Sequence, residues 1–165
     1  MNTRRMTVQD VDRVYEIELK SFHTPWTRED FHREMTENAC ARYVVAEMDG
    51  QVVGYAGAWC VLEEGHITNI AVHPDFRGQG AGSAVTQALM EYCANLGVNY
   101  MTLEVRKGNT IAWKMYEKLG FIRLGVRKKY YEDNGEDAYL YVCDHLPDPD
   151  PDFSEEATNQ EGGLR

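Results

Sequence analysis

The sequence predicts an α/β protein: a mixed, mostly antiparallel central sheet with helices on both of its faces. Three observations lead to this fold class. Short apolar segments of period two alternate with segments in which apolar residues recur every three or four positions. The early strands follow one another as a meander, whereas the later ones are separated by helices. A glycine-rich stretch also joins one strand to a long helix.

The first half of the chain is expected to hold a short strand, two helices and a β-hairpin. Thr7 with Asp10, and Thr27 with Asp30, have the spacing of capping boxes at helix starts. Asp49-Gly50 is typical of a hairpin turn. The expected elements are a strand over 3–6, a helix with its stripe at Val11, Val14, Ile17 and Glu18, a second helix with Phe31 and Met35, and strands over 43–48 and 52–60.

The second half alternates strands with helices and closes with a hairpin. Val85, Leu89, Tyr92 and Leu96 form one face of a helix that Gly97 ends. The other expected elements are a strand over 66–72, a glycine-rich stretch over 73–82, a strand over 100–106, a helix from Asn109 or Thr110 to Leu119, a strand over 121–131, a turn at Asn134-Gly135 and a strand over 138–143.

Composition predicts one globular domain with an acidic extension. A chain of 165 residues, 43% of them apolar, suits a single core. We assign this domain to residues 1–146. Residues 147–165 hold three prolines, six acids and one base, and are expected to be a disordered tail.

The charge and the cysteines narrow the class of protein. A net charge of −10, about half of it in the body, argues against nucleic acid as a direct partner. It favours a basic protein or peptide, and the alternative is that it only keeps the protein in solution. Apolar runs are too short for a membrane span. Four scattered cysteines indicate reduced thiols and a cytoplasmic location. The histidines lack metal-ligand spacing, so no metal site is expected.

The strongest chemical signal is the loop Arg77-Gly78-Gln79-Gly80-Ala81-Gly82 between a strand and a helix. Glycine lets the backbone turn its N–H groups toward a ligand, and a helix N-terminus favours an anion. Arg77 can pair with a phosphate. The loop therefore predicts a pyrophosphate site. It lacks the G-K-[ST] of a Walker loop. A dinucleotide fold stays a weaker alternative, because Glu104 lies where a ribose-binding acid would lie.

These motifs resemble the GNAT superfamily of N-acetyltransferases. Residues 69–82 read NIAVHPDFRGQGAG, which is similar to its acetyl-CoA signature, Q/R-x-x-G-x-G/A. Residues 103–106 (LEVR) and 116–121 (YEKLGF) match the second half of that fold. The Pro25-Trp26 pair, the LEVR strand and the segment KYY at 129–131 resemble the RimI-type branch, the ribosomal-protein alanine N-acetyltransferases. The resemblance covers about residues 3–146.

The resemblance implies roles for particular residues. Glu104 would be the general base and Tyr116 the general acid. Acetyl-CoA would be the acetyl donor, and no metal would take part. The cofactor-binding residues would be Ile70, Ala71 and Val72 on the strand, Arg77, Gly78, Gln79, Gly80, Ala81 and Gly82 in the loop, and Asn109. One position departs from the family, because Gly108 stands where many relatives carry Ser.

Acetyl transfer to an α-amino group is the reaction that these residues suit best. An α-amine has a pKa near ~7.7–8.0, against ~10.4 for a lysine side chain, so one carboxylate is adequate for an N-terminus. By resemblance, the acceptor is the N-terminal alanine of ribosomal protein S18. Two alternatives are an acetyltransferase acting on a small amine or a lysine side chain, and a non-catalytic acyl-CoA-binding module.

Several residues keep a plainer interpretation. Asn109 could serve only as a helix N-cap. Tyr116 could only pack in the core, and Glu104 could lie on a solvated strand face, since strand faces alternate. A basic group of Arg123, Arg127, Lys128 and Lys129 could contact a phosphate, an acidic partner or solvent. The sequence does not decide among these.

Overall fold

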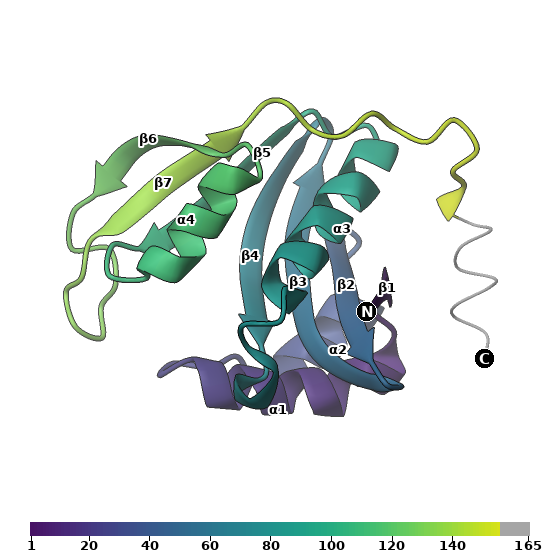
Figure 1. Cartoon of the computed structure of the whole chain (residues 1–165), viewed down its shortest axis with the longest axis horizontal. Coiled ribbons are helices and arrows are strands. Elements are labelled where there is room, and N and C mark those ends of the chain that lie inside the picture. The colour runs from purple at the N-terminus through teal and green to yellow at the C-terminus, as the bar shows by residue number, and fades with distance from the viewer. Residues whose placement is uncertain (156–165) are drawn as a thin grey trace.

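A computed structural model describes residues 1–155 as one mixed sheet with helices on both faces, as the sequence predicts (Figure 1). In this part of the chain the strand order is β1-β2-β3-β4-β5-β7-β6. The strands are β1 Asn2–Arg5, β2 Ala41–Met48, β3 Gln51–Val61, β4 Glu64–Val72, β5 Tyr100–Arg106, β6 Ile122–Arg127 and β7 Ala138–Cys143. The helices are α1 Val11–Ser21, α2 Arg28–Thr36, α3 Ala81–Asn95 and α4 Thr110–Lys118, with 3-10 turns η1 Val8–Asp10 and η2 Pro74–Phe76.

Local signals set most element boundaries. The capping box predicted at α2 is confirmed, because Thr27 N–H donates to Asp30 Oδ2 at 2.8 Å and Asp30 N–H donates to Thr27 Oγ1 at 3.1 Å. Asp49 and Gly50 both have positive φ, 52° and 77°, in the tight turn between β2 and β3. Gly97, with φ 93°, follows α3. These boundaries depend on short-range hydrogen bonds and backbone conformation, which is why the sequence shows them.

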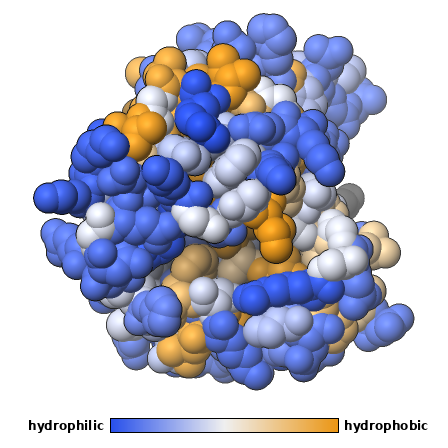
Figure 2. All heavy atoms as spheres, turned by 60° about the vertical axis from the view of Figure 1, so that its left-hand side comes forward, coloured by the Kyte–Doolittle hydropathy of each residue, from blue (hydrophilic) through white to orange (hydrophobic). Residues whose placement is uncertain are grey.

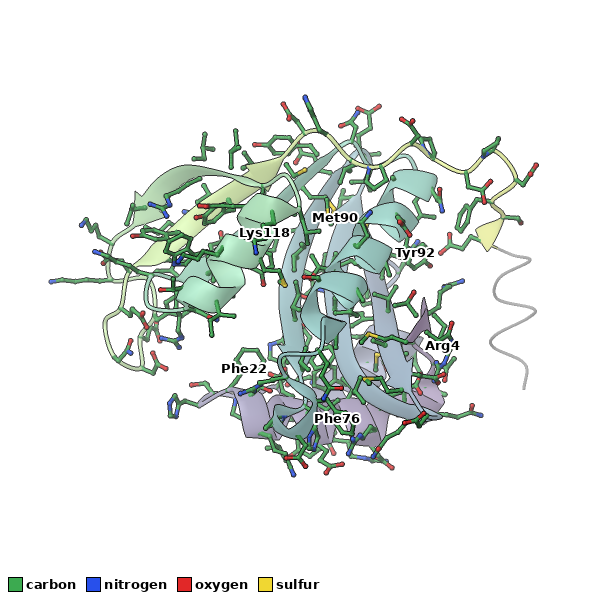
Figure 3. All side chains as sticks on the ribbon, viewed as in Figure 1. Arg4, Phe22, Phe76, Met90, Tyr92 and Lys118 are labelled. Atoms are coloured by element: carbon green, nitrogen blue, oxygen red, sulfur yellow. The ribbon has the colours of Figure 1, made fainter. Side chains whose placement is uncertain are left out.

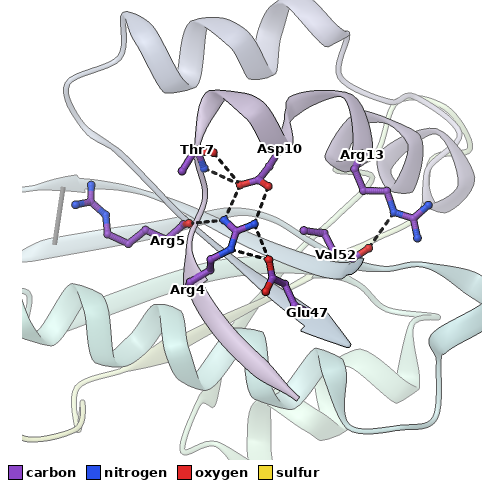
Figure 4. A network of polar contacts seen from close by, with 7 residues as sticks. All are labelled: Arg4, Arg5, Thr7, Asp10, Arg13, Glu47 and Val52. Carbon is purple, nitrogen blue, oxygen red and sulfur yellow. Dashed lines mark hydrogen bonds and ion pairs between the residues drawn. The ribbon is translucent and has the colours of Figure 1, made fainter. Parts of the chain in front are cut away.

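A partly buried ion network ties β1 to its neighbours (Figure 4). The Arg4 guanidinium donates to both carboxylate oxygens of Asp10 at 2.8 Å and to Glu47 Oε1 at 2.7 Å. Thr7 N–H also donates to Asp10, at 2.8 Å. The short β1 is therefore fixed both to η1 and to β2, and helix α1 leaves η1 at a defined angle.

Two apolar clusters lie on opposite faces of the sheet. The α3–α4 face contains Val85, Leu89, Met101, Leu103 and Tyr141, among other side chains. The cluster under α1 and α2 is smaller and is built around Val14, Ile17, Phe31, Tyr43 and Tyr55. Because helices cover both faces, the centre of the sheet leaves no apolar face open to solvent. The sheet can therefore serve as a rigid support for the site.

The sheet opens between its two parallel strands. β4 and β5 pair only from Glu64 to His66 on one strand and from Tyr100 to Thr102 on the other. Beyond these three rungs the strands diverge (Figure 1). All other strand pairs of the described chain are antiparallel and run longer.

Strand β6 is shorter than the sequence predicts. It ends at Arg127 instead of 131, and Lys129 has φ 50°. Asp137 Oδ1 accepts the N–H of Lys129 at 2.9 Å, and Tyr131 N–H donates to Glu136 O at 3.1 Å. These bonds fold residues 128–137 into a compact loop, in place of a longer hairpin.

The first part of the acidic tail also differs from expectation, because residues 147–155 lie against the body. Phe153 packs on Tyr92 of α3 with ring centroids 6.1 Å apart, and Figure 3 labels Tyr92 beside this segment. The Glu155 carboxylate accepts from the Tyr92 hydroxyl at 3.0 Å and pairs with Arg42 at 3.0 Å. The Phe153 ring and the Glu155 carboxylate hold this segment against the body, and the composition of the tail does not reveal such contacts. The expectation for residues 156–165 falls outside the described chain.

Packing at Gly57 yields a stability prediction. Its backbone lies so close to the ring of Tyr43 that a Cβ atom would overlap the ring. We expect Gly57→Ala to lower the free energy of unfolding by at least ~1–3 kcal/mol, measured by urea denaturation. Gly125→Ala is the matched control, since a Cβ there meets nothing within 4 Å. Equal effects of the two substitutions would contradict the packing argument.

Candidate active site

A cleft of about 790 Å³ lies where β4 and β5 diverge. Its walls come from the α1–α2 connection, the two strands, the start of α4 and the β6–β7 loop. Figure 2 views this side of the molecule and shows a hollow with apolar side chains in its floor and polar ones on its rims. Of the predicted site residues, the cleft brings together Ile70, Glu104, Asn109 and Tyr116.

Glu104 stands on β5, inside the cleft, with only 12% of its side chain exposed. Its two oxygens face different partners: Oε2 lies 3.3 Å from His66 Nε2, and Oε1 lies 3.3 Å from Arg127 Nε. The carboxylate is therefore held between two nitrogen groups and is not a freely solvated strand residue. Of the basic group that the sequence left undecided, Arg127 is the member that meets this acid.

Tyr116 is buried on α4 and lines the cleft. Its ring packs edge-on against Phe121, with centroids 6.0 Å apart. Within residues 1–155 its hydroxyl has no hydrogen-bond partner. Burial raises the pKa of Tyr116, and the nearby Tyr131 raises it further. The phenol therefore stays protonated over the neutral range and can donate a proton or a hydrogen bond.

Asn109 performs the capping role that the sequence allowed. Its Oδ1 accepts the N–H of Ala112 at 3.3 Å at the start of α4. The neighbouring Gly108 N–H donates to Glu136 Oε2 at 2.8 Å, and a Cβ at Gly108 would lie 2.8 Å from that same oxygen. Glycine at 108 thus lets the β6–β7 loop approach α4 closely. Asn109 also lines the cleft, so its capping role does not remove it from the site.

The glycine loop lies outside the cleft lining, at the far end of β4. Gly78 and Gly80 have φ of 78° and 86°, which L side chains rarely adopt. Gly80 precedes α3, and a Cβ at Gly82 would lie 3.3 Å from Met115 Sδ on α4. In the described chain the N–H groups of residues 78–83 donate to no protein acceptor. This donor set at a helix N-terminus fits a diphosphate.

Arg77 holds the loop in place by side-chain contacts. Its Nε donates to Val72 O at 3.2 Å and its Nη2 to Ser21 Oγ at 3.4 Å. The guanidinium thus ties the loop to β4 and α1, and its remaining N–H groups are the ones available for a phosphate.

The strand segment 70–72 has one paired and one open edge. Ile70, Ala71 and Val72 pair with β3, but β4 has no partner on its β5 side beyond His66. The open edge runs from the cleft toward the glycine loop. An extended ligand arm that forms backbone hydrogen bonds fits such an edge.

Sequence reasoning missed a buried polar network in the cleft wall formed by α1 and the α1–α2 connection. Glu18 is 2% exposed; it accepts from the Tyr55 hydroxyl and from Trp26 N–H, the latter at 2.9 Å. Asn69 Nδ2 lies 3.5 Å from the same carboxylate. The network ties the loop after α1, which carries the cleft residue Phe22 (Figure 3), to β3 and β4. One signal was present: Glu18 occupies a core position of the α1 stripe.

Two further findings concern metal binding and membrane insertion. Among residues 1–155 no three His, Cys, Asp or Glu side chains are grouped so that they could hold a metal ion. No described helix combines the length and the apolar character that a bilayer crossing needs.

The comparisons with known proteins agree on one family. The family described as "Acetyltransferase (GNAT) family" matches residues 11–121. An Escherichia coli protein named ribosomal protein bS18-alanine N-acetyltransferase is 34% identical over 145 residues, 85% of this chain and 95% of that one. A Bacillus subtilis relative, whose name proposes the same activity, is 44% identical over 83% of this chain and 91% of its own. The crystal structure of the ribosomal-protein-S18-alanine N-acetyltransferase from Escherichia coli superposes with a TM-score of 0.80 at 28% identity, covering 93% of this chain and 98% of that one.

The Glu18 network predicts a pH-dependent stability. Burial raises the pKa of Glu18, and the donors from Tyr55 and Trp26 offset this only in part. The folded protein therefore holds the Glu18 proton more tightly than the unfolded chain does. Its free energy of unfolding should fall as pH rises from the ordinary glutamate pKa, about 4.3, through the raised folded-state pKa.

Glu18→Gln removes this titration. We expect the unfolding free energy of the wild type, relative to that of E18Q, to decrease as pH rises through the same window, measured by urea denaturation at each pH. Glu29→Gln, at an exposed glutamate of α2, corrects for the loss of one charge. A wild-type-to-E18Q difference that stays constant with pH would refute the raised pKa.

Proposed function

The chain belongs to the GNAT family of acetyl-CoA-dependent N-acetyltransferases, and from that membership we propose that it acetylates the N-terminal alanine of ribosomal protein bS18. One observation carries the choice of acceptor. The two relatives whose names state or propose this activity align over 91% and 95% of their own length and over 83% and 85% of this chain. A net charge of −10 supports a basic protein as the acceptor.

The donor end of the site consists of backbone groups. Acetyl-CoA supplies an activated thioester, so the protein needs to supply position and proton transfer. In our proposal the free N–H groups of 78–82 and the Arg77 guanidinium hold the diphosphate. The open edge of β4 at Ile70, Ala71 and Val72 aligns the extended arm, and the Asn109 amide contacts it near the cleft.

The acceptor end requires one base and one donor. Glu104 takes a proton from the α-amino group, which is already partly neutral near pH 7 because its pKa is about 7.7–8.0. Tyr116 presents a protonated hydroxyl to the cleft and donates to the leaving sulfur. Glu104 lies on β5 and Tyr116 lies on α4, and both line the same cleft. The cleft therefore contains one carboxylate and one phenol.

A thiol-release assay tests the acceptor. With acetyl-CoA as donor, we expect a basic hexapeptide that begins with alanine to give a far higher kcat/KM than free lysine or spermidine, because the site offers one carboxylate base suited to an α-amine. Release confined to spermidine would replace the proposed acceptor with a small amine. No release with any acceptor would favour a binding module.

Tyr116→Phe tests the proposed proton donor. We expect turnover to fall by about 10- to 1000-fold with little change in melting temperature, since the ring and its contact with Phe121 remain. Tyr15→Phe, at a tyrosine that lies outside the cleft lining, is the matched control. Wild-type turnover in the Tyr116 variant would remove this residue from the mechanism.

A further inference from the structure

A chain of three side chains leads from the cleft to the surface. His66 on β4 and Thr102 on β5 are direct neighbours in the parallel register, and His66 Nδ1 lies 2.8 Å from Thr102 Oγ1. The other ring nitrogen, Nε2, lies 3.3 Å from Glu104 Oε2. The contact joins the last paired rung of the two strands to the cleft residue Glu104, two positions beyond Thr102 on β5.

Of the two groups that contact the Glu104 carboxylate, one can accept a proton. Arg127 has no acceptor atom and keeps its charge at every working pH. Imidazole exchanges protons in the neutral range and has one acceptor nitrogen in its neutral form. Glu104 is 12% exposed and His66 is 43% exposed. The histidine is therefore far more open to solvent than the carboxylate.

The Thr102 hydroxyl can accept from Nδ1–H or donate to Nδ1, so it bonds either neutral tautomer of His66. When the threonine oxygen accepts from Nδ1–H, the neutral ring carries its proton on Nδ1 and turns the lone pair of Nε2 toward Glu104. The charged groups facing His66 are Glu104 on β5 and, across that carboxylate, Arg127 on β6. Trp59, its partner on β3, carries no charge.

We propose that His66 relays the catalytic proton from Glu104 to solvent; this rests on the proposed role of Glu104 as base. The N–H bond of the acceptor amine breaks and an O–H bond forms on Glu104. That proton then passes to Nε2 of His66, which restores the carboxylate and makes an imidazolium. The imidazolium releases one proton to water and returns to its neutral form. His66 acts through Glu104 and does not touch the acceptor.

Chemical rescue tests the relay in the full-length protein. We expect His66→Ala to lower kcat by about 10- to 100-fold near pH 7. Added imidazole should restore a large part of that loss in a saturable way, because it can occupy the vacated space. His66→Gln keeps a polar side chain but cannot carry a proton, so it should be slow and should not respond to imidazole. His145→Ala, at an exposed histidine outside the cleft, is the matched control.

The outcomes distinguish a failure of the proposed His66 relay from a failure of the proposed Glu104 base. Wild-type kcat in His66→Ala, or a loss that imidazole leaves unchanged while the melting temperature is intact, would overturn the relay. Glu104→Gln is measured beside it and should be slow with or without imidazole. If Glu104→Gln turns over normally, the proposed base is wrong, whatever His66 does.

Discussion

The whole site depends on the short parallel pairing of β4 and β5. These strands share three rungs and then part, whereas each of their other neighbours stays paired over a longer stretch. Parting exposes the backbone edge of β4 and makes room for side chains of β5. The divergence of β4 and β5 therefore has two consequences. A ligand arm can pair with the open edge of β4, and Glu104 can lie inside a cleft instead of on a closed surface.

The two walls of the opening are rigid for different reasons. On the side of α1, the buried Glu18 carboxylate accepts hydrogen bonds from Tyr55 and Trp26, which joins α1, its following loop and the sheet. A buried charge is costly unless several groups bond it, so this wall resists rearrangement. On the other side, Tyr116 is packed against Phe121 and its hydroxyl is left for the cleft. One wall uses polar bonds and the other uses ring packing.

The glycine loop links the two helices of the other face to the opening. Gly78 and Gly80 need positive φ to turn their N–H groups outward, and Gly82 needs the absence of a Cβ to let Met115 of α4 approach. The start of α3 and the helix that carries Tyr116 are thus in contact. The proposed diphosphate site at one end of β4 and the proposed proton donor in the cleft therefore belong to the same packed pair of helices.

The sequence by itself determined what depends on near neighbours: the order of strands and helices, the α2 capping box, the Asp49-Gly50 turn and the glycine loop. Each follows from residues a few positions apart. It also named Glu104 and Tyr116 through their motifs, although the roles remain proposals. Alternation along β5 could not tell a solvated carboxylate from an enclosed one.

Tertiary structure alone decided the rest. The contacts of Glu104 with His66 and Arg127 require four strands, β4, β5, β7 and β6, in a particular register, and the docking of residues 147–155 requires the surface of α3. These pairs are separated by about 20 to 60 residues. No local pattern specifies which distant side chains meet, because that depends on how the sheet is ordered and where two of its strands part.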